Sequence, residues 1–303
     1  MAFRASTLFA ALLAIALAGC HTYDTYLIQR KWIDIPYATV SPFQKLDIYL
    51  PNEGSGPFPV IVSIHGGGFS FGDKFGGDLR PALTGLARGY AVAAVNYRLS
   101  GEAPFPAQIN DVKAAIRFLR ANAANYQLNT SKIAVWGSSA GGGLAALAGT
   151  SGGVKALADP ALGNAGQSDK VQAVVDWYGP INFLTMDGQF KQSGIDGMVH
   201  NEADSFESKL MGKQITLVPD LVRKANPETY ITANDPPFFI QHGDADKLIP
   251  SQQSAEFAKK LQQKLGKSKV TFELLPGAGH GDAKFVTAEN TAKVLDFLDK
   301  VLK

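Results

Sequence analysis

The chain has 303 residues, of which 46% are hydrophobic and 18% are charged, so it is long enough to bury one large core in a single domain. The net charge is only +2 and the lysines and arginines are scattered, which excludes the basic surface of a nucleic-acid-binding protein. A single cysteine excludes a disulfide within the chain and a cysteine-based metal site. These properties favour a small molecule or a polymer as the ligand.

The first twenty residues, MAFRASTLFAALLAIALAGC, are typical of a secretory signal: an arginine, an apolar run and then small residues. The run is too short for a membrane-spanning helix, which needs roughly 20 apolar residues. Its end, Leu17-Ala18-Gly19-Cys20, resembles the lipobox of bacterial lipoproteins. We therefore expect residues 1–20 to hold a lipoprotein-type signal cleaved before Cys20, with the lipid on Cys20 anchoring an exported protein to a membrane. The alternative is ordinary cleavage after Ala18, with Cys20 incidental.

From residue 21 to residue 303, short apolar runs rich in β-branched residues alternate with helical patterns. This alternation is typical of an α/β fold, with a mostly parallel sheet flanked by helices. Two early runs, Tyr26–Tyr37 and Lys45–Leu50, are expected to be antiparallel edge strands because Pro36 and Pro51 interrupt them. The remaining expected strands, which bring the total to eight, are Phe58–His65, Tyr90–Tyr97, Lys132–Gly137, Val171–Tyr178, Pro237–His242 and Val270–Leu275.

Apolar residues at spacings of three and four predict amphipathic helices over Asp111–Ala121, over Ser251–Leu265 and from Asp282 to the C-terminus. A further helix, built of small residues, is expected over Gly142–Gly149. The segment Ser151–Lys170 is rich in glycine, alanine and serine, and we expect it to be a loop.

One connection, from Gly179 to Asp235, is too long for a simple crossover between strands. Long connections inside compact domains are usually functional, often as lids, so we expect a cap insertion over about residues 181–232. Since this segment leaves the sheet at the carboxyl ends of the strands, we expect it to lie over the ligand pocket. The alternative is a surface decoration without contact to the ligand.

The sequence His65-Gly66-Gly67-Gly68-Phe69 follows the first predicted parallel strand. It matches the HGGG pattern of loops whose backbone N–H groups face a tetrahedral oxyanion. Glycine suits such a loop because a Cβ would crowd the approaching acyl group. We expect Gly67 and Gly68 to donate alongside the N–H of Ala140, and His65 to be structural. A loop that is merely flexible is the alternative.

The sequence Gly137-Ser138-Ser139-Ala140-Gly141 is a G-x-S-x-G motif between a predicted strand and a predicted helix. In that context the motif forms a sharp turn that lifts the serine hydroxyl above the sheet, and the neighbours must be small. The start of the helix also favours developing negative charge. We therefore predict Ser139 as a nucleophile and Ser138 as a framework residue.

A serine hydroxyl is a weak nucleophile until a neighbouring base takes its proton. The chain offers five histidines as that base, namely His21, His65, His200, His242 and His280. In proteins with this turn the order along the chain is serine, acid, histidine. His280 follows the last predicted strand in a glycine-rich loop and is the predicted base. His242 precedes the acid candidates and is expected to pack or hydrogen-bond beneath the site.

The acid should follow the strand Pro237–His242, where both Asp244 and Asp246 are available. Its role would be to hold the histidine tautomer and stabilise the imidazolium without taking the proton. Either aspartate could instead shape the turn or cap the next helix. The spacing along the sequence does not decide between Asp244 and Asp246.

These motifs, together with Asn96-Tyr97-Arg98-Leu99 and Pro104-Phe105-Pro106, resemble the hormone-sensitive-lipase side of the α/β-hydrolase superfamily. From about Lys31 to the C-terminus the chain is also similar to the branch of bifunctional acetylxylan and feruloyl esterases. The similarity lies in four stretches: Phe105–Ala121, Val135–Leu147, Val171–Pro180 and Pro236–Pro250.

The resemblance implies an α/β-hydrolase fold and a serine esterase that needs no cofactor or metal. It implies that the acid is the aspartate of H-G-x-x-D, which is Asp246 in this chain. It also implies short acyl or hydroxycinnamoyl esters on sugars, such as acetyl or feruloyl groups of plant polysaccharide, as substrates. From position, the residues expected to select the substrate are Phe69, Tyr178, Met198 and His200, with Phe71 and Met186 as further candidates.

Three other functions remain open at this point. A broad carboxylesterase or lipase of the same fold would use the same residues, and an amidase could use the same serine, histidine and acid. A lipoprotein that keeps the scaffold only as a binding module is disfavoured, since such a module has no need for the complete set of catalytic residues and the glycine loop.

Overall fold

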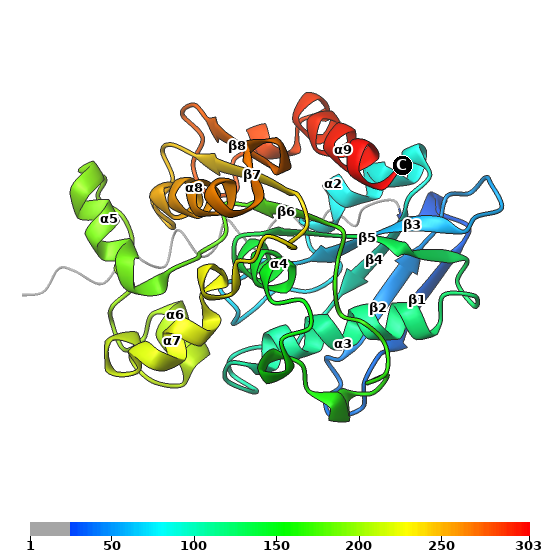
Figure 1. The fold of residues 1–303 in the computed structure, drawn as a ribbon, viewed down its shortest axis with the longest axis horizontal. Helices are drawn as coiled ribbons and strands as arrows, with labels where there is room; N and C mark the ends of the chain where they lie inside the picture. The colour runs from blue at the N-terminus through cyan, green and yellow to red at the C-terminus, as the bar shows by residue number, and fades with distance from the viewer. Residues whose placement is uncertain (1–24) are drawn as a thin grey trace, which may run out of the picture.

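A computed structural model describes residues 25–303. One eight-stranded sheet runs through it in the order β1-β2-β4-β3-β5-β6-β7-β8, with helices on both faces (Figure 1). The strands are β1 Lys31–Pro36, β2 Lys45–Tyr49, β3 Phe58–Ile64, β4 Ala91–Val95, β5 Leu128–Ser138, β6 Ala173–Trp177, β7 Phe238–Gly243 and β8 Val270–Leu275. All neighbouring pairs from β4 to β8 are parallel, and β2 is antiparallel to β1 and to β4. The predicted α/β class and eight-stranded sheet are confirmed.

Helices cover both faces of this sheet, and the two buried apolar clusters show which helix covers which face. One cluster joins the sheet to α3, α4 and α8, and the other joins it to α2 and α9. The α-helices are α2 Leu79–Leu83, α3 Ala107–Ala121, α4 Ala140–Thr150, α5 Met186–Ser193, α6 Phe206–Met211, α7 Pro219–Ala225, α8 Gln252–Leu265 and α9 Ala288–Leu302.

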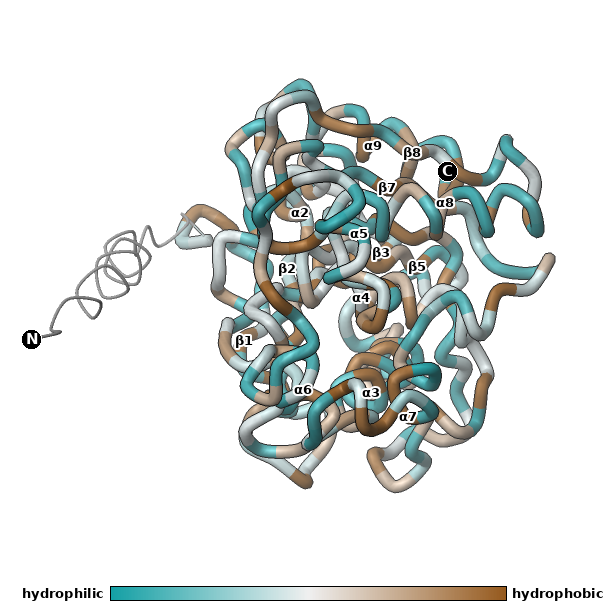
Figure 2. Tube along the Cα trace, turned by 90° about the vertical axis from the view of Figure 1, so that its left-hand side faces the viewer, coloured by the Kyte–Doolittle hydropathy of each residue, from teal (hydrophilic) through white to brown (hydrophobic). Residues whose placement is uncertain are grey.

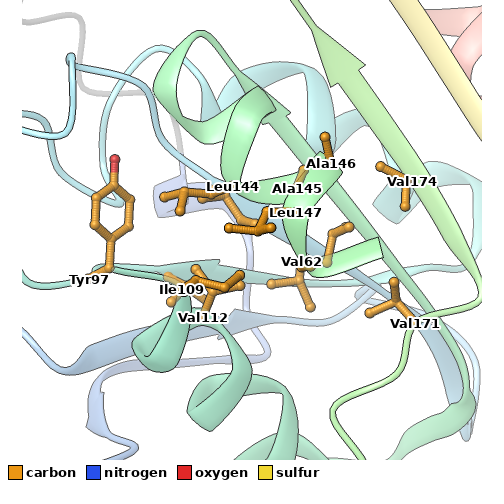
Figure 3. Packing of buried hydrophobic residues seen from close by; sticks show 14 of the residues in the cluster. Val62, Tyr97, Ile109, Val112, Leu144, Ala145, Ala146, Leu147, Val171 and Val174 are labelled. Atoms are coloured by element: carbon orange, nitrogen blue, oxygen red, sulfur yellow. The ribbon is translucent and has the colours of Figure 1, made fainter. Parts of the chain in front are cut away.

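The first cluster packs helices α3 and α4 against the centre of the sheet. Figure 3 shows Ile109 and Val112 of α3 close to Leu144 and Leu147 of α4, with Val62 of β3 beside them. These five side chains are buried. Hydrophilic segments lie along much of the outline of the molecule in Figure 2. Because α4 is held between the sheet and α3, the turn that begins it is anchored on two sides.

Two predictions about the first strands need correction. The run Tyr26–Tyr37 forms a strand only over Lys31–Pro36, because its first residues belong to a 3-10 turn over Thr25–Leu27. The run Lys45–Leu50 is antiparallel as predicted but is not an edge strand, since β2 pairs with β1 on one side and β4 on the other. Proline at the ends of a strand is therefore compatible with an interior position, because it leaves the ladder between the ends intact.

The predicted helices form, with shifted starts. Helix α3 begins at Ala107 and not at Asp111, directly after Pro106. The C-terminal segment divides at Thr287, whose side chain caps α9 by accepting from Asn290 N–H, after a 3-10 turn over Ala283–Val286. Helix α2 has only five residues and was not predicted, because one turn is too short to show helical periodicity.

The long connection after β6 carries helices α5, α6 and α7 and short 3-10 turns. We call residues 181–232 the cap segment. In Figure 1 its three helices lie at the left of the molecule, with α5 apart from α6 and α7, and away from the strands β1 and β2. Within residues 25–303 no helix is both long and apolar enough to cross a membrane. The signal and lipidation predictions, Cys20 included, lie outside the described residues.

Candidate active site

Ser139 stands on a strained turn between β5 and α4. Strand β5 ends at Ser138 and α4 begins at Ala140, and between them Ser139 has φ +54° and ψ −126°. A non-glycine residue keeps such a conformation only where its surroundings enforce it. A Cβ at Gly137 would lie 2.1 Å from the carbonyl oxygen of Gly141, and a Cβ at Gly141 would lie 2.1 Å from that of Ile64. The small neighbours predicted from the motif are thus required by space.

Hydrogen bonds connect Ser139 to His280 and His280 to Asp246. The Nε2 of His280 is 2.8 Å from the Oγ of Ser139, and its Nδ1 is 2.7 Å from an Oδ2 of Asp246. A carboxylate only accepts, so Nδ1 donates to Asp246 and leaves the Nε2 lone pair free to accept from the serine. Ser139 and His280 are 141 positions apart in the sequence. Together with Asp246 they are arranged as nucleophile, base and orienting acid.

Asp246 is buried, with 1% of its surface exposed, and its other oxygen accepts from the backbone N–H of Leu248 and Ile249 at 2.7 and 3.0 Å. Burial by itself would raise the pKa of Asp246. The hydrogen bonds and charges of His242 and His280 outweigh burial, and the pKa lies well below its usual value. The acid is therefore ionised throughout the neutral range, as an orienting acid must be.

The two candidates for the acid differ in their contacts. Asp246 contacts His280, whereas Asp244 accepts from the N–H of Gly277 at 2.6 Å and shapes the turn after β8. His242 lies beneath the site as expected. Its Nδ1 is 2.7 Å from the Oγ of Ser254 and its Nε2 is 3.3 Å from the Oδ2 of Asp246. His242 thus contacts the same oxygen of Asp246 as His280 does.

The glycine loop lies beside Ser139. Gly67 and Gly68 both have positive φ, +106° and +55°, which accounts for glycine at these positions. No acceptor within residues 25–303 takes a hydrogen bond from the N–H of Gly67 or Gly68. Ala140 is the first residue of α4, so its N–H has no acceptor within the helix. All three residues line one pocket with Ser139 and His280.

His65 supports this loop and does not face the nucleophile. Its ring stacks on that of Tyr97, with centroids 4.4 Å apart and planes 11° apart, and the Tyr97 hydroxyl donates to the His65 carbonyl oxygen at 2.9 Å. Its Nδ1 contacts the carbonyl oxygen of Gly66 at 2.7 Å. The side chain is buried, and burial lowers its pKa, so the ring is neutral at physiological pH. The structural role predicted for His65 agrees with these contacts.

This arrangement can carry out acyl transfer. A substrate carbonyl above Ser139 would meet the nucleophile from one side and unpaired backbone N–H groups from the other. Residues 25–303 hold no cluster of three or more His, Cys, Asp or Glu side chains suited to a metal ion. The pocket has a volume of about 250 Å³.

A family model, BD-FAE, matches residues 46–261, which include Ser139, Asp246 and the glycine loop. The chain belongs to the BD-FAE family. Members of this family are esterases with the α/β-hydrolase fold, and the recognition made from the motifs is confirmed. His280 lies beyond the matched residues, so its assignment rests on the geometry described above.

Solved structures show how far this similarity to BD-FAE proteins extends. A truncated carbohydrate esterase from gut microbiota is 34% identical, with a TM-score of 0.80 over 89% of this chain and 95% of that one. A bifunctional GH43-CE protein of Bacteroides eggerthii is 38% identical, with a TM-score of 0.82 over 90% of this chain and 35% of that one. In the latter protein the BD-FAE fold is therefore one part of a longer chain.

Curated relatives include the esterases LipC and LipQ of Mycobacterium tuberculosis. LipC is 31% identical over 244 residues, which are 79% of this chain and 57% of LipC. LipQ is 31% identical over 252 residues, which are 82% of this chain and 56% of LipQ. The BD-FAE chain thus spans little more than half the length of these relatives.

All four residues predicted to select the substrate of this BD-FAE protein line the pocket: Phe69, Tyr178, Met198 and His200. Tyr178 packs its ring against His280, with centroids 4.7 Å apart. Phe71 also lines the pocket, with 58% of its surface exposed. Met186 does not line it, because its side chain is fully buried in the core. That candidate was wrong, since apolar residues of the cap segment also supply its own packing.

Hydrogen bonds connect the cap segment to the loop that carries Asp246. The N–H of Met198 donates to the carbonyl oxygen of Lys247 at 2.8 Å, and His200 Nε2 is 2.9 Å from the carbonyl oxygen of Leu248. His200 Nδ1 contacts the carboxylate of Glu207 in α6 at 3.0 Å. His200 is itself fully buried, so it forms the wall of the pocket behind the exposed side chains.

Other pocket residues of the BD-FAE chain were not predicted as such. The ring of Phe206 in α6 covers the glycine loop, where a Cβ on Gly68 would lie 2.6 Å from it. Asp78 and Glu207 also line the pocket. No local motif marks these two acidic residues, which reach the site through contacts between distant segments.

Proposed function

We propose that this protein is a serine carboxylic-ester hydrolase that forms an acyl-enzyme at Ser139. The observation that carries the proposal is the continuous hydrogen-bonded set Asp246, His280 and Ser139 beside the unpaired N–H groups of Gly67 and Gly68. The names of the related esterases support it. A binding module would have no use for this complete arrangement.

In the first half of the reaction, Ser139 Oγ attacks the ester carbonyl carbon while His280 Nε2 takes the hydroxyl proton. The carbonyl oxygen becomes an oxyanion and accepts hydrogen bonds from Gly67, Gly68 and Ala140. Asp246 stabilises the resulting imidazolium without taking its proton. When the tetrahedral intermediate collapses, the bond to the alcohol breaks and His280 gives the proton to the departing oxygen. The acyl group stays on Ser139.

In the second half, water takes the place of the alcohol. His280 removes a proton from the water as it attacks the acyl carbon, and the same N–H groups hold the second oxyanion. Collapse breaks the bond to Ser139 Oγ, which recovers its proton from His280. The products are a carboxylic acid and an alcohol, and the enzyme returns to its starting state.

For the substrate, we propose short acyl or hydroxycinnamoyl esters carried by sugars, such as the acetyl or feruloyl groups of plant polysaccharide. One solved relative is named a carbohydrate esterase and another a bifunctional GH43-CE protein, and the pocket is walled by the aromatic side chains of Phe69, Tyr178 and Phe206. A pocket of about 250 Å³ with aromatic walls suits a small or flat acyl group. The same catalytic residues can transfer different acyl groups to water, so the substrate is inferred from the pocket and the relatives and not from the mechanism.

A substrate panel tests this proposal. Acetylated xylo-oligosaccharide, methyl ferulate, p-nitrophenyl esters and an anilide are compared with the wild type and with Ser139→Ala. We expect the acetylated xylo-oligosaccharide or methyl ferulate to have the highest kcat/KM, and Ser139→Ala to lower every rate by about 10⁴-fold or more. The folded state is checked by circular dichroism. If only the anilide is cleaved, the enzyme is an amidase. If Ser139→Ala retains full activity, the proposed nucleophile is wrong.

We also propose that Cys20 is lipidated and anchors the exported protein to a membrane. The support is the lipobox-like sequence Leu17-Ala18-Gly19-Cys20. Expressed in a bacterial host, the full chain should partition into the detergent phase of Triton X-114, and Cys20→Ser should move it to the aqueous phase. Wild-type protein recovered entirely from the aqueous phase, after cleavage at Ala18, would overturn the proposal.

A further inference from the structure

Asp78 lies at the N-cap position of α2 but does not cap that helix. An aspartate there ordinarily accepts from the backbone N–H two or three residues later. The side chain of Asp78 makes no such hydrogen bond. It is instead partly buried and turned toward the active-site pocket, which it lines. The usual reason for an aspartate at a helix start therefore does not account for this one.

Both oxygens of Asp78 have partners in the two segments that form the site. Oδ2 accepts from the backbone N–H of Gly66 at 2.9 Å, and Oδ1 accepts from the hydroxyl of Ser138. Gly66 directly precedes Gly67 in the glycine loop, and Ser138 directly precedes Ser139. One carboxylate thus joins the residue before the oxyanion donors to the residue before the nucleophile, across 60 positions of sequence.

Both segments need such a support. The glycine loop has little intrinsic stiffness, because Gly67 and Gly68 can adopt many backbone conformations. Oxyanion donors act only when they lie about 3 Å from where the charge develops, and a displacement near 1 Å costs about 100-fold in rate. The turn at Ser139 keeps its positive φ only under external constraint. A charged acceptor forms stronger hydrogen bonds than a neutral one and suits this task.

We propose that Asp78 is a positioning residue that fixes the glycine loop relative to Ser139 and so sets the geometry of the oxyanion hole. This proposal rests on the proposed esterase function. Asparagine has nearly the same shape but no charge. Its oxygen can still accept from Gly66, while its NH2 group can only donate, so Ser138 would have to turn its hydroxyl and accept. Asp78→Asn should therefore replace two charge-assisted hydrogen bonds with weaker neutral ones, and so loosen both segments without removing side-chain volume.

The test compares Asp78→Asn with the wild type in three measurements on p-nitrophenyl acetate hydrolysis. We expect kcat to fall about 10- to 100-fold while KM changes less than about threefold, because donor placement matters in the transition state. The affinity of a trifluoromethyl ketone inhibitor, whose adduct fills the oxyanion hole, should fall by the same factor as kcat/KM. The melting temperature reports any general loss of stability.

Asp73→Asn is the matched control. Asp73 precedes α2 in the same connection and also accepts from a backbone N–H, that of Phe75 at 3.0 Å, but its other oxygen contacts Asn96 and not Ser138. We expect wild-type kcat and inhibitor affinity for this variant. Equal losses in both variants would show a general effect of the connection and would overturn the proposal.

Ser138→Ala removes only one of the two hydrogen bonds of Asp78 and provides a second variant should Asp78→Asn fold poorly. It should lower kcat less than Asp78→Asn does, and the double variant should lose less than the product of the single losses, because the two share one bond. Independent effects, or an Asp78→Asn variant with wild-type kcat, would overturn the positioning role. Absence of esterase activity in the wild type would instead overturn the proposed function.

Discussion

At the scale of single residues, Asp244 and Asp246 show that two identical side chains only two positions apart can have unrelated roles. The carboxylate of Asp246 is buried between two histidines, and that of Asp244 binds a turn N–H. Their spacing in the sequence carries no information about which one reaches His280. The H-G-x-x-D resemblance favours Asp246, and the hydrogen bond at 2.7 Å agrees with it.

We predict that Asp246→Asn lowers kcat by roughly 10⁴-fold, since an amide cannot hold the imidazole tautomer, by analogy with a serine protease. Asp244→Asn, the matched control, should stay within a few-fold of the wild type. Steady-state hydrolysis of p-nitrophenyl acetate at pH 8 measures both. The opposite ranking would move the acid to Asp244.

Asp176 is a buried acid that the reaction does not use. It lies in β6 with no surface exposed, and its Oδ1 accepts from the N–H of Gly179 at 3.0 Å. Its Oδ2 has no hydrogen-bond partner within residues 25–303. Burial raises the pKa of Asp176 to about 7. The folded state therefore holds a proton that the unfolded state releases near pH 3.8, and stability falls as the pH rises between these values.

Asp176→Asn should remove this loss of stability at high pH, because asparagine does not ionise. We expect the variant to be more stable than the wild type at pH 8, by an amount on the order of a few kcal/mol, and to show no such gain at pH 4. Urea unfolding at the two pH values measures the difference. A gain of the same size at both pH values would mean that the charge of Asp176 is not its cause.

At the scale of elements, the cap segment contributes both to the pocket wall and to the core. Met198 lines the pocket and is partly exposed, whereas Met186 is fully buried. We predict that Met198→Ala changes the ratio of kcat/KM for methyl ferulate over an acetyl ester by about threefold or more, because a pocket contact acts on the two transition states differently. Met186→Ala is the control and should lower stability with little change in that ratio. Equal losses on both esters for Met198→Ala would exclude it from the acyl pocket.

His200 connects three parts of the cap region. Its ring nitrogens face the Glu207 carboxylate and the Leu248 carbonyl oxygen, and its N–H donates to Asp187 of α5 at 2.7 Å. Both ring partners only accept, so the protonated ring satisfies both. Burial would lower the pKa of His200, but Glu207 first, and then Leu248 and Asp187, outweigh it, and the pKa is raised above 6.5.

A raised histidine pKa stabilises the folded state fully below pH 6.5, and that stabilisation disappears as the pH rises through the folded-state pKa. We therefore predict that the difference in unfolding free energy between the wild type and His200→Gln is larger at pH 6 than at pH 9. Chemical denaturation at both values provides the measurement. A difference that does not depend on pH would show that the ring stays neutral.

At the scale of the whole molecule, the sequence predicted the structures that a short segment determines by itself. The strand-turn-helix around Ser139 and the glycine loop have local sterics that only a few residue types satisfy. Strand order depends on pairing between distant segments, so β2 was wrongly placed at an edge. Asp78 contacts Ser138 from 60 positions away, and no residue near Asp78 in the sequence indicates that contact.

The hydrogen bonds from Met198 and His200 to the loop that carries Asp246 bear on how substrate enters the pocket. A cap that swung open would pull on Lys247 and Leu248, and Leu248 also donates to Asp246 at 2.7 Å. Opening would therefore disturb the catalytic acid, so the entrance should be fixed and interfacial activation absent. Initial rates with tributyrin should then follow a single saturation curve through its solubility limit. A sharp rise once droplets form would show that the cap opens at an oil–water surface, as in lipases.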